Sequence, residues 1–384
     1  MNKLKLKTLQ TNCCCLVINK FYSIKTNIKN YGQVISDAEK VVGVPTSFLS
    51  LRCLMNDEVA DIANHMRKLM GTGHPLINTA KDLIMEKDTM PKWGLIILLL
   101  SKCQQINIRL EIQPDLTEGI LPQQRTLAEV TEMVRISNVL HNSIVNHEKS
   151  DTSNSYGNKL ALLSGDFLLS TSFKLLAEMR NQEVNLLIST ALRDLNESNF
   201  IEPRDKQNKP LPAKPLKKKT EIEVPVELTM QPYKISEYLG SAKSEWTIRS
   251  LLGGATLMAR SCEATMILSE NIPYQNSAHV FGRNMGLLFQ ISQELKNFQD
   301  CASVELTSAP ILFHLEYEPS LYEEIVENSD KIEMDKLKNI VNNGPGIEKT
   351  IKLKKYFTNN ALKALHTFPK SKARLALESI IENM

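Results

Sequence analysis

The chain has 384 residues, of which 42% are hydrophobic and 23% are charged, and its formal net charge is +3. A chain of this length can bury one large core or two ordinary ones. So small a net charge, without any RNA- or DNA-binding motif, argues against a nucleic-acid partner. The longest dense apolar stretch, Trp93 to Leu100, is too short to span a bilayer. The seven cysteines show no metal-ligand spacing, which predicts isolated thiols and no metal site.

The N-terminal leader is basic. It contains six Lys and no acidic residue before Asp37. That pattern predicts a mitochondrial transit peptide over residues 1–30 and a location on the matrix side of the organelle. The leader departs from the usual pattern because it has no Arg and many Asn, so a disordered basic tail remains the alternative.

Folded sequence is expected from Tyr31 to the C-terminus, as one helical domain over residues 31–384. Apolar residues recur at helical spacing over 57–70, 93–103, 126–145, 156–170, 246–268, 276–298 and from 360 to the end. The third of these is expected to begin at the capping-box spacing of Thr126 and Glu129. Strand alternation is almost absent, so the predicted class is all-α. Between Phe200 and Ser244, six Pro and a Lys run predict a flexible insert at about 200–244 that buries little.

The stretch from Tyr156 to Ser170 is apolar on every face of a helix. Such a helix is buried in a large helical protein or spans a membrane. Gly165 and Asp166 interrupt the run too early for a span of about 20 residues. The stretch therefore predicts a helix deep in the core, in which Asp166 pairs with a neighbouring helix because an unpaired buried carboxylate is costly.

The same stretch, GNKLALLSGDFLL, closely resembles the GNKxAxLxGDxLL helix of the trans-prenyltransferases, or polyprenyl diphosphate synthases. The matching residues are Gly157, Asn158, Lys159, Gly165 and Asp166. The resemblance runs from about Gly32 to near the C-terminus. It implies an isoprenoid synthase-type helical bundle around a central cavity. Members condense isopentenyl diphosphate onto an allylic diphosphate, whose leaving group is neutralised by Mg²⁺ on carboxylates. The segment from Ser36 to Glu58 resembles the start of a divergent partner subunit of this family.

The family's first aspartate motif, DDxxD, lies in the helix before GNK, in the pattern AExxExIHxAxLxHDDxxD. This chain reads LAEVTEMVRISNVLHNSIVN from Leu127 to Asn146. The frame matches, but the three acidic positions hold Asn142, Ser143 and Asn146. His141, directly before them, is expected to line the core or the cavity.

The second aspartate motif follows the pattern GxxFQxxDDxLD, where this chain reads GLLFQISQELKN. Phe289 and Gln290 match and are expected to pack in the core, with the Gln hydrogen-bonded internally. The acidic positions hold Gln293, Glu294 and Asn297, so one acid of six remains across the two motifs. Glu294 is expected to be a solvated or paired helix acid. The family's Lys-Thr pair before Ala255 corresponds to Gly253-Gly254.

The retained frame and the lost acids together imply a non-catalytic subunit with no catalytic residue and no metal or cofactor of its own. Its implied partner is a catalytic polyprenyl diphosphate synthase subunit in a heteromer, commonly a heterotetramer, that makes the side chain of ubiquinone. Mg²⁺ is expected in that partner. Two alternatives remain: a module that binds an isoprenoid or lipid in the old cavity, and a divergent prenyltransferase that uses the surviving polar groups.

Overall fold

The computed structural model describes residues 31–43, 46, 76, 92–104, 119–145, 152–216, 222–225, 232–299, 304–327 and 332–384. Three predicted features lie outside these ranges: the leader over residues 1–30, the helix over 57–70 and the Lys run at 217–219. Within the described residues the chain forms helices and no strand, and the only β-type pairing is a single bridge between Arg204 and Pro210. The all-α prediction is confirmed.

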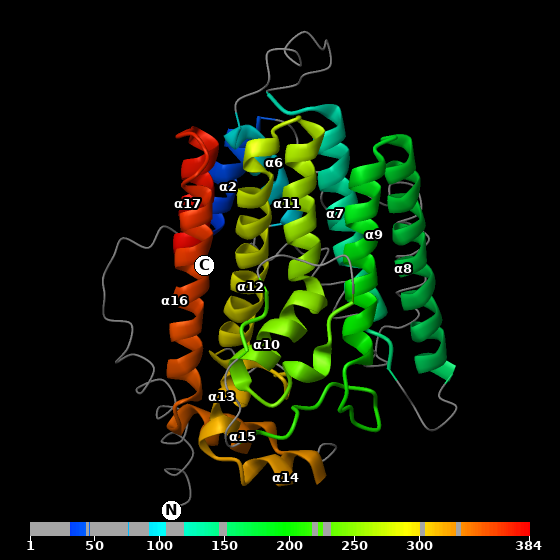
Figure 1. The fold of residues 1–384 in the computed structure, drawn as a ribbon. Coiled ribbons are helices and arrows are strands. Elements are labelled where there is room, and N and C mark those ends of the chain that lie inside the picture. Colours follow the sequence, from blue (N-terminus) through cyan, green and yellow to red (C-terminus); the bar gives the residue numbers. More distant parts are fainter. Residues whose placement is uncertain are drawn as a thin grey trace, which may run out of the picture.

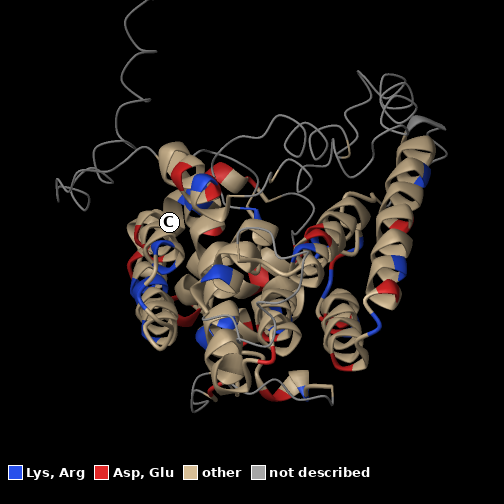
Figure 2. Cartoon of the chain, turned by 90° about the horizontal axis from the view of Figure 1, so that it is seen from above, with Lys and Arg blue, Asp and Glu red and all other residues tan. Residues whose placement is uncertain are grey.

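Long helices stand side by side, and the short helices α13 (Ala309–Tyr317), α14 (Leu321–Glu327) and α15 (Met334–Asn343) lie at one end of the bundle (Figure 1). The long ones are α7 (Pro122–His141), α8 (Thr152–Glu178), α9 (Gln182–Glu197), α11 (Thr256–Leu268), α12 (Gln275–Gln299) and α16 (Gly346–Leu365). The shorter ones are α2 (Tyr31–Val42), α6 (Trp93–Cys103), α10 (Ala242–Ser250), α13 (Ala309–Tyr317), α14 (Leu321–Glu327), α15 (Met334–Asn343) and α17 (Lys372–Asn383). Seen from above, basic and acidic residues are interspersed over the described elements (Figure 2).

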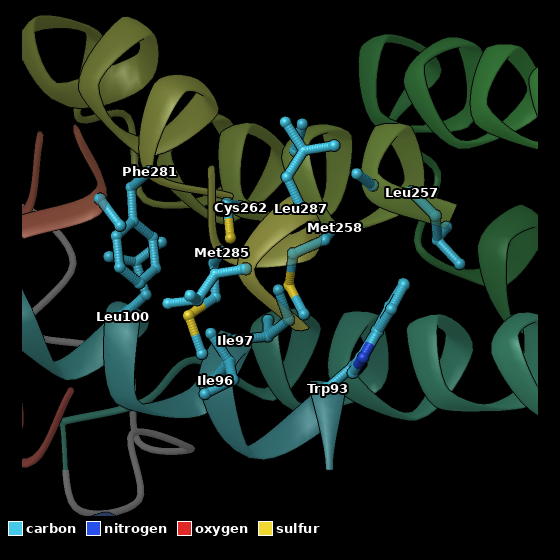
Figure 3. Packing of buried hydrophobic residues seen from close by; sticks show 14 of the residues in the cluster. Trp93, Ile96, Ile97, Leu100, Leu257, Met258, Cys262, Phe281, Met285 and Leu287 are labelled. Carbon is cyan, nitrogen blue, oxygen red and sulfur yellow. The ribbon is translucent and has the colours of Figure 1, made fainter. Parts of the chain in front are cut away.

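The core lies where α6, α11 and α12 meet. Figure 3 shows their apolar side chains filling this space, among them Ile96, Met258, Phe281 and Met285. All four are at most 1% exposed, so this contact excludes water. Helix α6 has the bounds that the sequence predicted. It is buried because its apolar residues occupy every face.

Two glycines bring α12 unusually close to its neighbours. A methyl group at Gly282 would lie 2.7 Å from the carbonyl oxygen of Met258, and one at Gly286 would lie 2.7 Å from Cα of Ala255. Ala255 ends a five-residue π-helical turn, Leu251–Ala255, that joins α10 to α11. The glycine of the GxxFQ pattern therefore sets the distance between α12 and this turn.

The predicted start of α7 is wrong by about one turn. The helix begins at Pro122, whose fixed φ suits a first helical position. The side chain of Gln124 caps it by accepting a hydrogen bond of 3.0 Å from the backbone N–H of Leu121. Thr126 lies inside the helix and donates to the carbonyl oxygen of Pro122 at 3.1 Å. The helix ends at His141, four residues before the predicted end.

The prediction that the segment from 200 to 244 buries little is wrong for the residues that the structure describes. Ile201, Leu211, Val224, Tyr233 and Tyr238 are each at most 8% exposed. Its backbone is also anchored, since the carbonyl oxygen of Val224 accepts a bond of 3.1 Å from the buried Arg283 of α12. Proline content predicted irregular backbone correctly, but apolar residues spaced between the prolines pack it onto the bundle.

Helix α8 lies at the edge of the bundle in Figure 1, which contradicts the prediction that it is buried deep in the core. It packs mainly along α7. Leu162, Leu163, Phe167 and Phe173 are 39–55% exposed. Its stretch Asn154–Glu178 is the one described helix long and apolar enough to cross a membrane, a test that core helices of soluble proteins also pass.

Candidate functional site

The two described positions of the first degenerate motif lie in a turn and not on a helix. Asn142 is the C-cap of α7 and is exposed to solvent, and Ser143 follows it. The hydroxyl of Ser143 is buried and donates to the carbonyl oxygen of Leu140 at 2.6 Å. Asn146 lies outside the described residues. The DDxxD motif places two side-chain oxygens one helical turn apart on the same face of a continuous helix. Here α7 ends at His141, before the motif positions.

Asn158 of the GNK motif holds the backbone that follows α7 in place. The side-chain amide of Asn158 bonds both backbone groups of Val145: its oxygen accepts from the N–H at 3.0 Å, and its N–H donates to the carbonyl at 2.8 Å. Gly157 is buried beside this contact, whereas Lys159 is exposed. The polar role of this segment is thus to fix the backbone that follows α7.

Gly165 and Asp166 complete the α7–α8 contact about two turns further along α8. The hydroxyl of Ser137 donates to the carbonyl oxygen of Gly165 at 2.8 Å. A methyl group at Gly165 would lie 2.2 Å from Nε2 of His141, so the absent side chain leaves room for the imidazole. His141 Nε2 lies 3.2 Å from Oδ1 of Asp166. The predicted pairing with a neighbouring helix is confirmed, but the predicted burial is wrong because Asp166 is 55% exposed.

Asp166→Asn is expected to lower the free energy of unfolding by less than about 1 kcal/mol, because a contact made by a solvent-exposed carboxylate contributes little. Urea unfolding of the two proteins measures the difference. His141→Ala should behave similarly, since it removes the other partner. A loss of more than about 2 kcal/mol from Asp166→Asn would contradict the exposed geometry of this pair.

The second degenerate motif places its one acid in the protein interior. Glu294 of α12 is 8% exposed. The indole N–H of Trp246 reaches its two oxygens at 3.0 and 2.9 Å. The backbone N–H of Ala309 donates to it at 2.8 Å and the side-chain amide of Gln290 at 2.9 Å. The prediction of a solvated or paired acid is therefore wrong: neutral donors from α10, α12 and α13 hold this carboxylate.

Burial raises the pKa of the Glu294 carboxyl to about 7, although the N–H donors of Ala309, Gln290 and Trp246 oppose the shift. Folding therefore favours its protonated form. Its contribution to stability is greatest below its unfolded pKa near 4.5 and is lost as the pH rises through about 7.

The free energy of unfolding of the wild-type protein is thus expected to fall between pH 5 and pH 8 relative to that of Glu294→Gln, by at most about 1.4 kcal/mol per pH unit. Urea unfolding at four pH values in this range measures it. Parallel curves for the two proteins would show that Glu294 does not change its protonation state in this window.

The other positions of the second motif make contacts of their own. Gln293 donates to the side-chain oxygen of Asn297 at 3.1 Å, and both are half-buried. Phe289, one turn before Gln293, packs edge-on against Trp93, with ring centroids 5.7 Å apart. A methyl group at Gly254 would lie 3.0 Å from the same indole ring. The chain thus has Gly253 and Gly254 at the positions of the family's Lys-Thr pair. The indole of Trp93 packs against Gly254.

The described positions of the two motifs do not fit Mg²⁺. The first motif offers an exposed turn amide and a hydroxyl that is already bonded, and the second offers one carboxylate that faces α10 and α13. Among the described residues, no three His, Cys, Asp or Glu side chains gather closely enough to hold a metal ion. Amide oxygens bind cations but do not balance the charge of several Mg²⁺ ions on a diphosphate.

Sequence reasoning missed three residues that shape this site. Trp246 was only the start of a predicted helix, yet it donates to Glu294. In the sequence, Trp93 is only the first residue of an apolar stretch, yet in the structure its indole fills the space between Gly254 and Phe289. Glu132 was part of the matching frame, and the structure shows that it accepts a 3.2 Å bond from the backbone N–H of Gly94 in α6. An acid inside an apolar helical pattern was the available signal for both Glu132 and Glu294.

Comparisons with known proteins find similar sequences among polyprenyl diphosphate synthases. The chain is 34% identical over 372 residues to human all trans-polyprenyl-diphosphate synthase PDSS2, covering 92% of this chain and 86% of that protein. It is 24% identical to the mitochondrial hexaprenyl pyrophosphate synthase of Saccharomyces cerevisiae, covering 92% and 94%. It is 27% identical over 286 residues to decaprenyl-diphosphate synthase subunit 1 of Schizosaccharomyces pombe, covering 70% and 69%. A scan of family models returned no match.

Solved structures show the same fold. A medium/long-chain length prenyl pyrophosphate synthase from Arabidopsis in its apo form superposes with a TM-score of 0.55 at 23% identity, over 86% of this chain and 96% of that one. A decaprenyl diphosphate synthase from Rhodobacter capsulatus gives 0.55 at 15% identity, over 90% and 97%. The isoprenoid synthase fold expected from the sequence is therefore confirmed. With a relative at 34% identity along nearly its whole length, the chain belongs to the polyprenyl diphosphate synthase family.

Proposed function

We propose that this chain is a non-catalytic subunit of a heteromeric all-trans-polyprenyl diphosphate synthase of the decaprenyl type, which makes the isoprenoid side chain of ubiquinone in mitochondria. The observation that carries the proposal is the setting of Glu294. The only acid left in the two motifs is buried and held by Trp246, Gln290 and Ala309. A buried carboxylate that accepts these three hydrogen bonds does not extend into a cavity to coordinate a metal ion.

The retained residues support the second half of the proposal. Asn158, Gly165 and Gly286 each serve packing or backbone hydrogen bonds and do not need a substrate to explain them. Their retention keeps the family fold, and with it a surface that a related subunit recognises. The partner is a catalytic synthase subunit that carries both aspartate motifs and binds the Mg²⁺ ions. Relatives named as subunits or as mitochondrial synthases favour this assignment and its location.

Co-expression with such a catalytic subunit tests the proposal. The two chains should purify as one complex, and polyprenyl diphosphate formation should fall at least tenfold when this chain is omitted. Asn297→Ala in this chain is the matched control, and it should leave product formation unchanged. Full activity of the catalytic subunit alone would refute the partner role. Binding of polyprenyl diphosphate by this chain without complex formation would favour the lipid-binding alternative instead.

A further inference from the structure

Arg283 is buried without a counter-charge in the described part of the chain. It lies in the middle of α12 and is 5% exposed. Its Nη2 donates to the carbonyl oxygen of Val224 at 3.1 Å, but its Nε has no hydrogen-bond partner among the described residues. The one described carboxylate that acts on it is that of Glu223, which is 79% exposed and lies 3.9 Å from Nζ of Lys243. A buried arginine keeps its proton, and an isolated buried charge is costly.

Other arginines of the same core have an acid beside them. Arg260 of α11 is also 5% exposed, and its Nη1 lies 3.3 Å from Oε2 of Glu263. Nε of Arg249 in α10 lies 3.0 Å from Oε1 of Glu245. In both pairs the acid is one helical turn away. Around Arg283 the corresponding four positions of α12 hold His279, Val280, Gly286 and Leu287. Its own helix therefore supplies no negative charge.

A second buried donor lies close to Arg283. Tyr233, in the segment before α10, is 8% exposed, and its hydroxyl has no hydrogen-bond partner in the described part of the chain. Tyr233 and Arg283 each affect the pKa of the other, which places them near one another. Burial raises the pKa of Tyr233 to about 12, so its hydroxyl is a neutral donor at pH 7. Asp194 also acts on Tyr233, but Arg193 and Arg260 balance that acid.

Tyr356 and Lys243 extend this group toward the surface. Tyr356 belongs to α16, which packs along α12 (Figure 1). It is 47% exposed and acts on the pKa of Arg283. Nζ of Lys243 lies 5.5 Å from the centre of the Tyr356 ring, so a second positive charge lies nearby. Arg283 is ten residues, or about 15 Å along the helix, before Gln293. This group of side chains is therefore separate from the second motif.

We propose that Arg283 and Tyr233 form a buried site for a small oxyanion of the phosphate class, with Lys243 at its edge. A guanidinium binds two oxygens of such an anion at once, and the hydroxyl of Tyr233 donates to another. A water molecule would accept these hydrogen bonds but would not balance the charge. The guanidinium also bonds Val224, so the bound anion fixes residues 222–225 against α12. The inference is independent of the proposed function.

Calorimetric titration of the full chain with inorganic phosphate, in a chloride buffer of constant pH and ionic strength, tests the site. The wild-type chain should bind one phosphate, and its Tm should rise with phosphate concentration because only the folded chain binds it. Arg283→Met should weaken phosphate binding at least tenfold and abolish the rise in Tm. Arg283→Lys keeps the charge without the planar fork, so its affinity should lie between those of the wild type and Arg283→Met.

Tyr233→Phe tests the same site without removing a buried charge. In chloride alone its Tm should equal that of the wild type, because the hydroxyl has no hydrogen-bond partner among the described residues. Its affinity for phosphate should fall about fivefold through the loss of one hydrogen bond. Tyr238→Phe is the matched control, since Tyr238 is a second buried tyrosine of the same segment. It should bind phosphate as tightly as the wild type.

Three results would overturn the inference. A wild-type Tm that is the same in phosphate and in chloride would show that no such site exists. Phosphate binding that persists in Arg283→Met would place the ion elsewhere on the chain. A loss of stability in chloride from Glu223→Gln or Glu227→Gln would show that an acid of the chain balances Arg283; Glu227 lies outside the described residues. None of these results bears on the role of the chain as a synthase subunit.

Discussion

Glu294→Ala should lower the free energy of unfolding by about 3 kcal/mol. The substitution leaves two buried donors, the indole N–H of Trp246 and the backbone N–H of Ala309, without an acceptor. Each stranded donor costs roughly 1–3 kcal/mol. The loss is large because these bonds join three helices, α10, α12 and α13. Urea unfolding at pH 7 measures the change.

Asn297→Ala is the matched control for Glu294→Ala, because it alters another position of the same motif. Its side chain accepts a hydrogen bond from Gln293 on the same helix, so a cost below about 1 kcal/mol is expected. Glu294→Gln should fall between the two, since an amide still offers one acceptor oxygen. Equal stabilities for Glu294→Ala and Asn297→Ala would show that the buried bonds of Glu294 contribute nothing.

Gly286→Val is expected to destabilise the protein by a similar amount, about 3 kcal/mol, through overpacking. Its Cβ would lie 2.7 Å from Cα and 2.8 Å from Cβ of Ala255, in the turn before α11. Backbone atoms cannot move aside as a flexible side chain can, so α12 must shift away from this turn. Thermal unfolding followed by circular dichroism measures the loss.

Gly253→Val provides the comparison for Gly286→Val, because Gly253 lies in that same turn and a methyl group there meets nothing within 4 Å. It is exposed and should tolerate the change at a cost below about 1 kcal/mol. If both substitutions lower the free energy of unfolding equally, the need for glycine at position 286 comes from its backbone preference and not from the distance between α12 and the turn.

The sequence predicted two of the buried helices closely. Helix α6 matched residue for residue, and the prediction over 276–298 is within one residue of α12 at each end. The C-terminal prediction was less complete: α16 begins at Gly346, well before residue 360, and Ser371 caps a separate α17. Lysines dominate the first half of α16, so its apolar stripe is narrow and harder to detect.

Helix α8 shows the limit of hydrophobic pattern. A hydrophobic pattern predicts a helix, but it does not indicate which part of the helix surface the rest of the chain covers. Periodicity therefore predicted the helix and misplaced it in the core, where the structure places it at the edge. The exposed Phe167 and Phe173 are the residues that a core position would have buried.

The setting of Glu294 could not be predicted for a different reason. Its donors, Trp246 and Ala309, are 48 and 15 residues away in the sequence, and only tertiary packing brings them together. The sequence indicated which acids are missing from the motifs. It did not indicate that the remaining one had become part of the core.

The most direct test is the assay of the isolated chain for Mg²⁺-dependent polyprenyl diphosphate synthesis, with a host synthase contaminant excluded by mass spectrometry. No product above background is expected from the wild-type chain. No product is expected either from a variant with Asp at positions 142, 143 and 146. Glu294 is still buried and hydrogen-bonded in that variant, and the second motif is still incomplete. Mg²⁺-dependent product from the isolated wild-type chain would contradict the account.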